Sequence, residues 1–347
     1  MTRECNDRYG RVHNSGFCRE STMKIAVIDD YQDAFRKLAV YSRLQGHDVV
    51  VFHDTEKDPA KLAARLADFE AVLLTQQRSP FPRTVIEKLP KLKLIAQTGR
   101  NTNHIDVDAC TEHGVAVAAA GSGTPHATAE LTWGLILASL RHIPHEVAQL
   151  KKGVWQTTVG TGLHGKTLGV YAPGRIGSCV AAVGKAFGMK VTCWGRDGSK
   201  AKARELGYAV PASREEFFAT ADVISIHIPL NKETRGIVTA ADLACMKPSA
   251  LFVNSSRAPL VAAGALVEAL RKGRPGFAAV DVYEDEPVVG ANHPLLKMPN
   301  VICTPHLGYV EQSTYETYYG AAIDGILGYA AGKPVNVLNP DALAKKK

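Results

Sequence analysis

Short apolar runs alternate with helical patterns along most of the chain, and this alternation limits the fold more than any other feature of the sequence. The first run, 23–28, ends in Asp29 and Asp30. A run of this kind is typical of a strand buried on both faces of a parallel sheet. Strands that alternate with helices predict parallel sheets covered by helices, which is the α/β class.

The pattern divides into two series, joined by a long apolar helix expected over 127–143. A chain of 347 residues is long enough for two domains with separate cores. In the first series we expect helices near 32–45 and 59–67 and after Pro82, and strands at 48–52, 71–75, 92–98 and 115–117. In the second series we expect strands at 167–171, 190–194, 223–228, 251–254 and 278–282.

Composition and charge exclude several classes of protein. Hydrophobic residues make up 46% of the chain and charged residues 22%, as in a globular protein rather than a disordered or fibrous one. The net charge of +7 includes three lysines at the C-terminus and four arginines before residue 20. No basic stripe interleaved with aromatic residues runs through the body, so we expect no nucleic-acid partner. An anionic substrate agrees with this charge.

Cysteine usage and the N-terminal residues indicate the compartment. The seven cysteines are odd in number, widely spaced and without CxxC pairs, so we predict buried thiols and no metal site. Residues 1–22 lack the apolar core of a signal peptide, and no apolar run reaches the length of a membrane span. We expect a cytoplasmic protein without a membrane partner, whose residues 1–22 are a disordered extension or precede the true start.

The strongest cofactor motif follows the strand predicted at 167–171. The chain continues there as Ala-Pro-Gly-Arg-Ile-Gly and then enters a helical pattern. In this context of strand, turn and helix, the pyrophosphate of a dinucleotide binds backbone N–H groups at the helix N-terminus. We therefore assign Gly174, Arg175, Ile176 and Gly177 to cofactor binding.

Two departures from this fingerprint leave alternatives open. Ala172 stands where the first glycine is expected, and Pro173 removes one N–H group, so a domain without a dinucleotide stays an alternative. At the end of the next strand, Gly195 replaces the acid that usually binds the adenosine ribose, and Arg196 follows it. Asp197, two residues after the usual position, stays a candidate for the ribose hydroxyls. Because an Arg suits a 2′-phosphate, both NAD and NADP are candidate cofactors.

Three segments at predicted strand ends carry the polar residues that a keto-acid reduction needs. They read Asn-Ser-Ser-Arg-Ala from 254, Asp-Val-Tyr-Glu-Asp-Glu-Pro from 281, and Thr-Pro-His-Leu-Gly from 304. Hydride transfer to a keto carbon requires a proton donor at the oxygen and a cation for the neighbouring carboxylate. We predict His306 as the donor, Glu286 as the carboxylate that orients its imidazole, and Arg257 as the cation.

These segments resemble the signatures of the D-isomer-specific 2-hydroxyacid dehydrogenases, in which an Arg follows an Asn-x-x strand end, a Glu precedes Pro and a His follows Thr-Pro. The resemblance covers about residues 23–340. It implies two Rossmann-like domains with parallel sheets and a cleft between them. These are a flavodoxin-like substrate-binding domain, 23–122 plus 312–347, and an NAD(P)-binding domain, 123–311. It also implies a homodimer with the helix from Ala127 at the interface.

The resemblance also implies further site residues. Gly99, Arg100 and Asn101, at a strand end of the first series, are implied to bind the substrate carboxylate together with Arg257. Arg100 is the candidate for substrate choice, and Asp281 is implied to lie near the nicotinamide amide. The remaining cofactor-binding residues that the family-like segments imply are Gly195, Arg196, Ile228, Pro229, Thr234, Ser255, Ser256 and Gly308.

The predicted activity is hydride transfer between NAD(P)(H) and a small 2-hydroxy or 2-keto acid. Formate dehydrogenases of the same group carry an amide where Glu286 stands, so the acid favours keto-acid chemistry. From another class, a dinucleotide-sensing scaffold like the C-terminal-binding-protein corepressors would keep the same three residues and act through protein contacts. Ala258, in place of the glycine usual after the Arg, is a small departure. The sequence does not name the particular acid.

Overall fold

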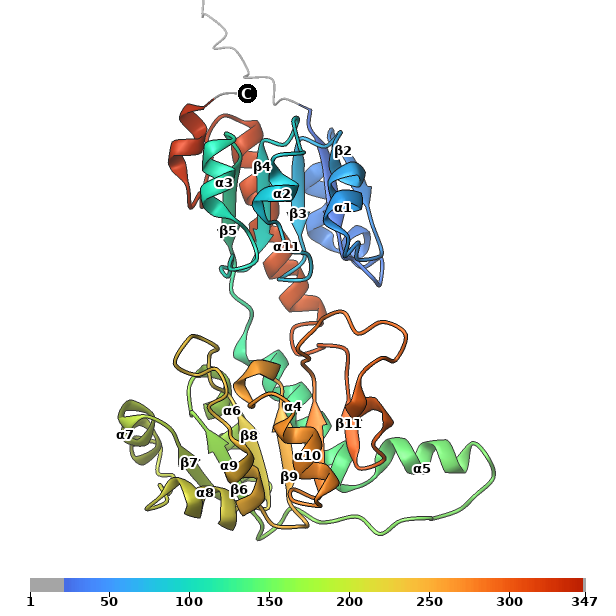
Figure 1. Ribbon diagram of the computed structural model, residues 1–347, viewed down its shortest axis with the longest axis vertical. Helices are drawn as coiled ribbons and strands as arrows, with labels where there is room; N and C mark the ends of the chain where they lie inside the picture. Colours follow the sequence, from blue (N-terminus) through green and yellow to red (C-terminus); the bar gives the residue numbers. More distant parts are fainter. Residues whose placement is uncertain (1–21, 346–347) are drawn as a thin grey trace, which may run out of the picture. The chain divides into compact units, whose positions relative to one another are not determined.

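The computed structural model describes residues 22–345, which form two units of parallel sheet and helices (Figure 1). One unit runs to Ala120 and resumes at Ala321, and the other comprises Gly121–Gly320. The extension predicted at 1–22 lies outside the described residues except for Thr22. Among residues 22–345, no helix combines the length and the apolar character that crossing a membrane requires.

The first unit contains a five-stranded parallel sheet in the order β2-β1-β3-β4-β5. Its central strands are apolar and almost completely buried, since helices α1, α2 and α3 cover one face and α11 lies against the other (Figure 1). The strands are β1 (Lys24–Ile28), β2 (Asp48–Val51), β3 (Ala71–Leu74), β4 (Leu94–Thr98) and β5 (Ala116–Ala120). The helices are α1 (Pro59–Leu66), α2 (Arg83–Ile86), α3 (Val107–Glu112) and α11 (Gln312–Ala330), of which the residues from Ala321 on belong to this unit.

The C-terminal residues close the first unit at β5. Asn339 Oδ1 accepts a hydrogen bond from the Val117 backbone N–H at 2.8 Å, and its Nδ2 donates to the Val115 carbonyl at 2.9 Å and to Thr111 Oγ1 at 3.0 Å. Asn339 is 6% exposed, so these bonds lie away from water. Residues that are more than 200 positions apart in sequence therefore complete one sheet edge.

The helix predicted over 32–45 is wrong. The segment forms two 3-10 helices, η1 (Phe35–Lys37) and η2 (Ala39–Leu44), separated by the extended residue Leu38. The carboxylate of Asp30 accepts hydrogen bonds from two backbone N–H groups at the start of η1, at 2.9 and 3.0 Å. A side chain that bonds to nearby backbone in this way offers those groups a partner other than the α-helical one.

The second unit contains a six-stranded parallel sheet in the order β11-β10-β9-β8-β6-β7. Because the strands are parallel, their carboxyl ends meet at one edge, and the strand order changes direction beside β6, where α/β sheets bind ligands. The strands are β6 (Thr167–Tyr171), β7 (Lys190–Trp194), β8 (Val223–Ile226), β9 (Leu251–Asn254), β10 (Phe277–Val280) and β11 (Val301–Cys303). The main covering helices are α4 (Pro125–Leu140), α6 (Arg175–Ala186), α7 (Asp197–Glu205), α8 (Arg214–Thr220), α9 (Ala240–Cys245) and α10 (Ala265–Arg271).

The helix predicted over 127–143 is confirmed as α4, but it ends three residues early. α4 ends at Leu140, and α5 (Ile143–Leu150) follows His142, whose φ of 50° is left-handed. α4 packs inside the second unit, where the Trp133 indole N–H donates to the Val180 carbonyl of α6 at 3.2 Å. The buried residues of α4 are thus engaged within the unit, and the homodimer interface implied for this helix stays a prediction. α5 has no buried residue and projects from the unit (Figure 1).

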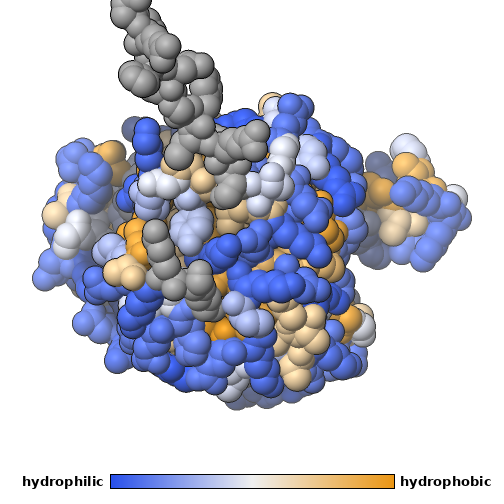
Figure 2. Space-filling model, turned by 90° about the horizontal axis from the view of Figure 1, so that it is seen from above, coloured by the Kyte–Doolittle hydropathy of each residue, from blue (hydrophilic) through white to orange (hydrophobic). Residues whose placement is uncertain are grey.

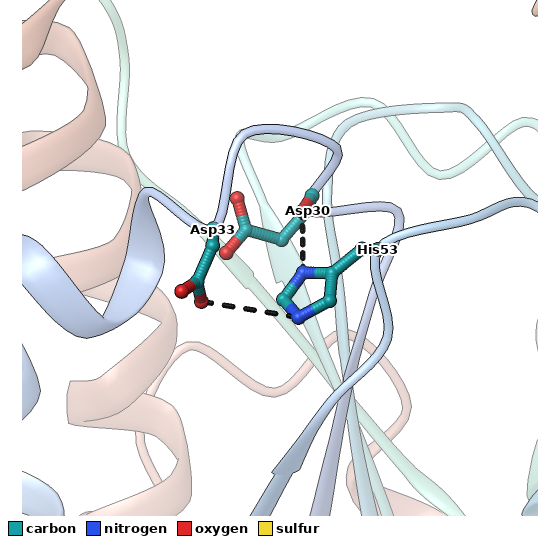
Figure 3. Close-up of side chains that lie close together, drawn as sticks. All are labelled: Asp30, Asp33 and His53. Atoms are coloured by element: carbon teal, nitrogen blue, oxygen red, sulfur yellow. Dashed lines mark hydrogen bonds and ion pairs between the residues drawn. The ribbon is translucent and has the colours of Figure 1, made fainter.

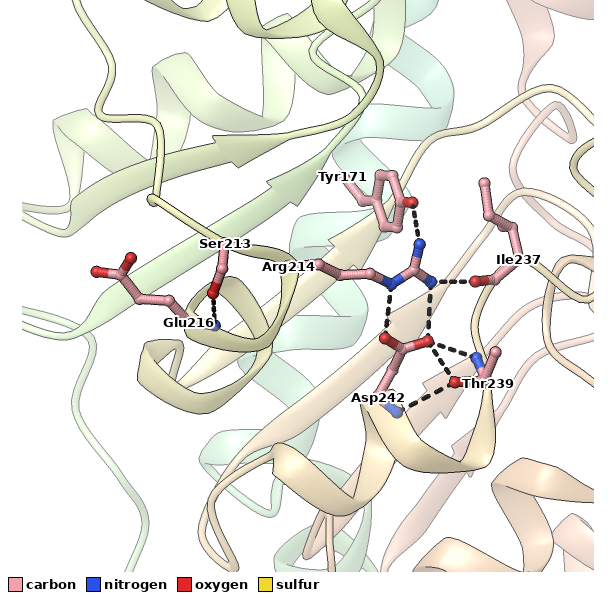
Figure 4. Close-up of polar contacts among 7 residues, drawn as sticks. All are labelled: Tyr171, Ser213, Arg214, Glu216, Ile237, Thr239 and Asp242. Atoms are coloured by element: carbon pink, nitrogen blue, oxygen red, sulfur yellow. Dashed lines mark hydrogen bonds and ion pairs between the residues drawn. The ribbon is translucent and has the colours of Figure 1, made fainter.

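A partly buried ion pair fixes the end of β6, next to the cofactor turn (Figure 4). Arg214 of α8 donates from Nε to Asp242 Oδ1 at 2.6 Å and from Nη2 to Asp242 Oδ2 at 2.8 Å. Its Nη1 donates to the Tyr171 hydroxyl at 3.1 Å, and Nη2 also donates to the Ile237 carbonyl. Asp242 accepts from the backbone N–H of Thr239, which caps α9. Since Tyr171 ends β6, this network holds the strand from which the turn begins.

Candidate active site

The turn after β6 leads directly into α6, so the N-terminus of that helix lies at the carboxyl edge of the sheet. Gly174 is the N-cap, and Arg175 and Ile176 begin the helix. A Cβ on Gly177 would lie 2.4 Å from the Ala172 carbonyl oxygen, so only glycine lets the helix approach the turn this closely. A close-packed helix N-terminus of this kind suits a pyrophosphate.

Ala172 makes the tight turn although it carries a Cβ. Its φ of 68° lies in the left-handed region. Its N–H donates to the Trp194 carbonyl at 2.8 Å, and its own carbonyl accepts from the Gly174 N–H at 2.8 Å. The carbonyl of Pro173 accepts from Ser178 Oγ, also at 2.8 Å. The departure from the glycine pattern therefore costs some backbone strain but leaves the turn intact.

The end of β7 presents two cations, Arg196 and Lys200, and one exposed acid, Asp197, whose Oδ1 lies 3.9 Å from Lys200 Nζ. Arg196 Nη1 lies 3.3 Å from Glu233 Oε2, and these side chains are 74% and 75% exposed, so the pair contributes little to stability. Lys200 Nζ lies 4.1 Å from the centre of the Trp194 ring. Gly195 has a φ of 153°, and a Cβ there would meet the Ser199 side chain at 2.7 Å. Sequence reasoning identified Arg196 and missed Lys200, which stands one helical turn further on.

The loop that carries Arg257 is shaped by the residue that ends β9. Asn254 Nδ2 donates to the Arg257 carbonyl at 3.0 Å, and its Oδ1 accepts from the Ser256 N–H at 3.0 Å. Ser256 Oγ donates to the Ile226 carbonyl at 2.7 Å, and Ser255 Oγ lies 2.8 Å from Thr132 Oγ1. Ser255 and Ser256 thus tie this loop to the neighbouring strand and to α4.

His306 and Glu286 form a close, mostly buried pair. His306 Nδ1 lies 2.7 Å from Glu286 Oε2, and each side chain is 17% exposed. The second carboxylate oxygen, Oε1, accepts from the Tyr283 N–H at 2.9 Å, so the carboxylate is oriented by the backbone. His306 has a φ of 55°, a strained left-handed backbone conformation. Its ring also meets Tyr309 edge to face, with centroids 5.6 Å apart.

Asp281 supports the loop that carries His306. It is fully buried, and its Oδ1 accepts from Thr304 Oγ1 at 2.6 Å and from the Leu307 N–H at 2.7 Å. Its Oδ2 accepts from the Gly308 N–H at 2.9 Å. Burial raises the pKa of Asp281, and the hydrogen bond from Thr304 opposes this effect. Asp281 thus holds both sides of His306, and its contact with a nicotinamide amide stays a prediction.

Sequence reasoning missed several supports of the site. Thr128 Oγ1 of α4 donates to the Gly308 carbonyl at 2.8 Å, and the Tyr283 hydroxyl donates to the Thr304 carbonyl at 2.9 Å. Thr304 and Tyr283 lie inside the family-like segments, so their positions next to the predicted catalytic residues could have identified them as supports. Thr128 lies 180 residues from its partner and carries no local signal.

The other predicted residues divide between the two units. Ile228, Pro229 and Thr234 form a turn after β8, in which Thr234 Oγ1 donates to the Pro229 carbonyl at 2.7 Å. Arg257, Glu286 and His306 lie on loops that follow the adjacent strands β9, β10 and β11. The predicted substrate residues belong to the first unit, where they follow β4: Gly99, Arg100 and Asn101.

One group in the described residues offers metal-type ligands, although the sequence predicts no metal. Ligand atoms of Asp30, Asp33 and His53 lie within 4.8 Å of one another (Figure 3). The Asp30 carboxylate already caps η1, and His53 Nδ1 contacts the Asp30 carbonyl at 3.0 Å. Asp33 Oδ1 lies 4.0 Å from His53 Nε2. We assign no metal to this group because its most buried carboxylate is already engaged by the backbone.

Comparison with known proteins identifies the family. The model for "D-isomer specific 2-hydroxyacid dehydrogenase, NAD binding domain" matches residues 133–308. The chain is 36% identical to a glyoxylate reductase of Aeropyrum pernix over 81% of its own length and 85% of that protein. It is 41% identical to a D-3-phosphoglycerate dehydrogenase of Methanocaldococcus jannaschii. That match covers 68% of this chain but only 45% of the longer dehydrogenase.

The solved structures agree with the sequence comparisons. A phosphoglycerate oxidoreductase from Vibrio cholerae superimposes with a TM-score of 0.87 at 49% identity, covering 90% of this chain and 100% of that one. These relatives are enzymes and lend no support to the corepressor alternative. The α/β fold with two parallel sheets and the nicotinamide cofactor predicted from the sequence are confirmed. The chain belongs to the D-isomer-specific 2-hydroxyacid dehydrogenases and is an NAD(P)-dependent oxidoreductase of that family.

Proposed function

We propose that the protein reduces a small 2-keto acid to its 2-hydroxy acid, and catalyses the reverse reaction, with Arg257, Glu286 and His306 as catalytic residues. The observation that carries this proposal is the 2.7 Å pair of His306 and Glu286. The pair lies at the same sheet edge as Arg257 and the turn at Gly174. When bound, the nicotinamide ring supplies or accepts the hydride.

His306 acts as the general acid in reduction and the general base in oxidation. Because Glu286 holds its Nδ1, the proton passes at Nε2, the nitrogen on the other side of the ring. The ionised carboxylate stabilises the imidazolium form, which donates to the carbonyl oxygen as the hydride arrives. Arg257 binds the substrate carboxylate and carbonyl oxygen through its fork of N–H groups, which fixes the keto carbon in place.

The two units bind different ligands in this proposal. We assign 123–311 to NAD(P) binding and 23–122 plus 312–347 to substrate binding, with Gly99, Arg100 and Asn101 after β4 contacting the substrate carboxylate. The carboxyl edge of a parallel sheet is where α/β domains bind ligands. The chain spans 85% of the glyoxylate reductase, 45% of the phosphoglycerate dehydrogenase and 100% of the phosphoglycerate oxidoreductase, so length does not select the acid, and a panel of short keto acids is tested first.

The protein acts as a homodimer whose contact is the arm formed by α5 and the segment to residue 160. The arm is ordered by its own hydrogen bonds, since Glu146 accepts from Thr157 Oγ1 at 2.8 Å and from Thr158 Oγ1 at 2.6 Å. Hydrophobic side chains remain exposed on this arm, which is seen at the right of Figure 2. They are Ile143, Val147, Leu150, Val154, Trp155 and Val159, which are 44% to 95% exposed.

The oligomeric state is tested by sedimentation of the wild type and of the double variant Val147→Lys, Leu150→Lys. We expect a dimer for the wild type and a monomer for the variant. Val289→Lys is the control, because Val289 is 70% exposed but lies outside the arm. A dimeric double variant would contradict this interface. Of the cysteines in residues 22–345, Cys110 and Cys193 are buried as predicted, whereas Cys179, Cys245 and Cys303 are only half-buried, and no two of them form a disulfide. Unlinked thiols agree with the cytoplasmic location that we propose.

The activity is tested by the loss of reduced-nicotinamide absorbance with NADH or NADPH against glyoxylate, hydroxypyruvate, pyruvate and a branched keto acid. We expect turnover with at least one pair, and a loss of turnover in His306→Ala and Arg257→Ala with cofactor binding retained. Binding of cofactor without turnover of any acid would contradict the proposed function. Wild-type rates in either variant would contradict the assigned catalytic residues.

A further inference from the structure

A buried carboxylate joins three loops of the first unit. Asp29 directly follows β1, is 2% exposed and has a left-handed φ of 65°. Thr55 Oγ1, after β2, donates to its Oδ1 at 2.5 Å, and Ser79 Oγ, after β3, donates to its Oδ2 at 2.9 Å. The Tyr31 hydroxyl lies 2.5 Å from Thr55 Oγ1 and extends the network. The carboxyl ends of three adjacent strands thus share one acid.

Burial disfavours the ionised form of Asp29, and the polar groups around it oppose this effect. Burial raises the pKa of Asp29 to about 6, although the hydroxyls of Thr55 and Ser79 and the charge of Arg78 each lower it. Arg78 precedes Ser79 and is only 8% exposed, so two opposite charges lie inside this edge. A buried cation depends on nearby negative charge.

The remaining charged groups of these loops are already engaged. Asp54 is held by Arg65 at 2.8 Å, the Asp30 carboxylate caps η1, and Asp33 and His53 face one another at 4.0 Å. Among these acids, Asp29 is the one whose two oxygens reach from the loop after β1 to the loops after β2 and β3.

We propose that Asp29 is a positioning residue for substrate binding: its carboxylate, bonded to Thr55 and Ser79 and balanced by Arg78, fixes the loops that frame the substrate at the carboxyl edge of the first unit. The inference rests on the proposed function, because it takes this edge as the substrate side. A carboxylate is needed rather than an amide, since both oxygens accept and the buried guanidinium requires a countercharge. The left-handed backbone of Asp29 and the burial of its carboxylate both cost free energy of folding. Strained residues and buried acids of this kind cluster at functional sites.

The test compares Asp29→Asn with the wild type in steady-state keto-acid reduction between pH 5 and 8. We expect KM for the keto acid to rise about tenfold or more at pH 8, with kcat changed less than about threefold, because loop position affects binding more than chemistry. Ser79→Ala removes one donor and should raise KM by a smaller factor. Asp58→Asn is the control, because Asp58 only caps α1 and is replaceable there.

The pH profile separates positioning from simple structural damage. The ratio of the variant KM to the wild-type KM should decline as the pH falls through about 6. Protonation of Asp29 in the wild type then removes the same charge that Asn lacks. An unchanged KM in Asp29→Asn at pH 8, or a pH-independent ratio, would overturn the proposal.

Failure of the proposed function gives a different result. In that case the wild type itself consumes no reduced nicotinamide with any keto acid, and hydrogen exchange of residues 76–81 decides the positioning role. We expect faster exchange there in Asp29→Asn and in Ser79→Ala than in Asp58→Asn. Equal exchange in the three variants would overturn the positioning role as well.

Discussion

Glu286 binds the His306 imidazole with one carboxylate oxygen and the Tyr283 backbone N–H with the other, at 2.7 and 2.9 Å. This arrangement leads to a prediction for Glu286→Gln. The amide keeps the shape but removes the negative charge that stabilises the imidazolium, so kcat for reduction should fall about 10- to 100-fold. A kcat profile identical to the wild type would contradict the role of Glu286.

Arg257→Lys tests whether the geometry of the cation matters as well as its charge. A lysine keeps the positive charge but has no planar fork for carboxylate and carbonyl oxygen together. We expect kcat/KM to fall about 100-fold while the fluorescence titration with NADH is unchanged. If Lys restores most of the activity that Ala loses, the fork is not needed.

Arg196→Ala tests which dinucleotide the end of β7 prefers. If Arg196 binds a 2′-phosphate, the variant should lose about tenfold or more in NADPH affinity and little in NADH affinity. Lys202→Ala is the matched control, because Lys202 lies on the same helix but pairs with Glu205 at 2.8 Å. Equal losses for both cofactors would refute the role of Arg196.

Asp29→Asn should change the pH dependence of stability. The folded pKa of Asp29, about 6, lies above the ordinary value of 3.8, so the native state favours its protonated form. The stability that this carboxyl contributes is therefore present below about 3.8 and is lost as the pH rises through 6. The loss totals about 3 kcal/mol, roughly half of it between pH 5 and 8. Urea unfolding should show this loss in the wild type and not in the variant, and parallel curves would contradict it.

The sequence predicted every strand except β11 because buried parallel strands are short apolar runs, and β1, β6 and β9 lie where those runs lie. The three residues of β11, Val301–Cys303, are only partly buried and make too short a run to be recognised. It also placed Arg257, Glu286 and His306 on loops after neighbouring strands. The helix expected over 32–45 failed because the Asp30 side chain offers the backbone another partner. The end of the helix expected over 127–143 was placed three residues too late for a different reason, since a left-handed residue inside an apolar pattern has no signal of its own.

The supports of the site were less predictable than the site itself. Asp281 and Gly308 belong to recognisable segments, but Thr128 reaches Gly308 from a helix far away in sequence. The network of Asp29 with Thr55 and Ser79 joins three separate loops, and each of these residues alone reads as an ordinary polar loop residue. Contacts of this kind come from the tertiary fold, which one sequence does not reveal.

The discontinuity of the first unit has a consequence for synthesis on the ribosome. The edge at β5 is completed by Asn339, whereas the second unit is contiguous from Gly121 to Gly320. The second unit therefore has all its strands as soon as β11 has emerged, while the first unit must wait with an unpaired edge until nearly the whole chain is translated. The nascent half-finished sheet is the part of this protein that most needs protection from premature association.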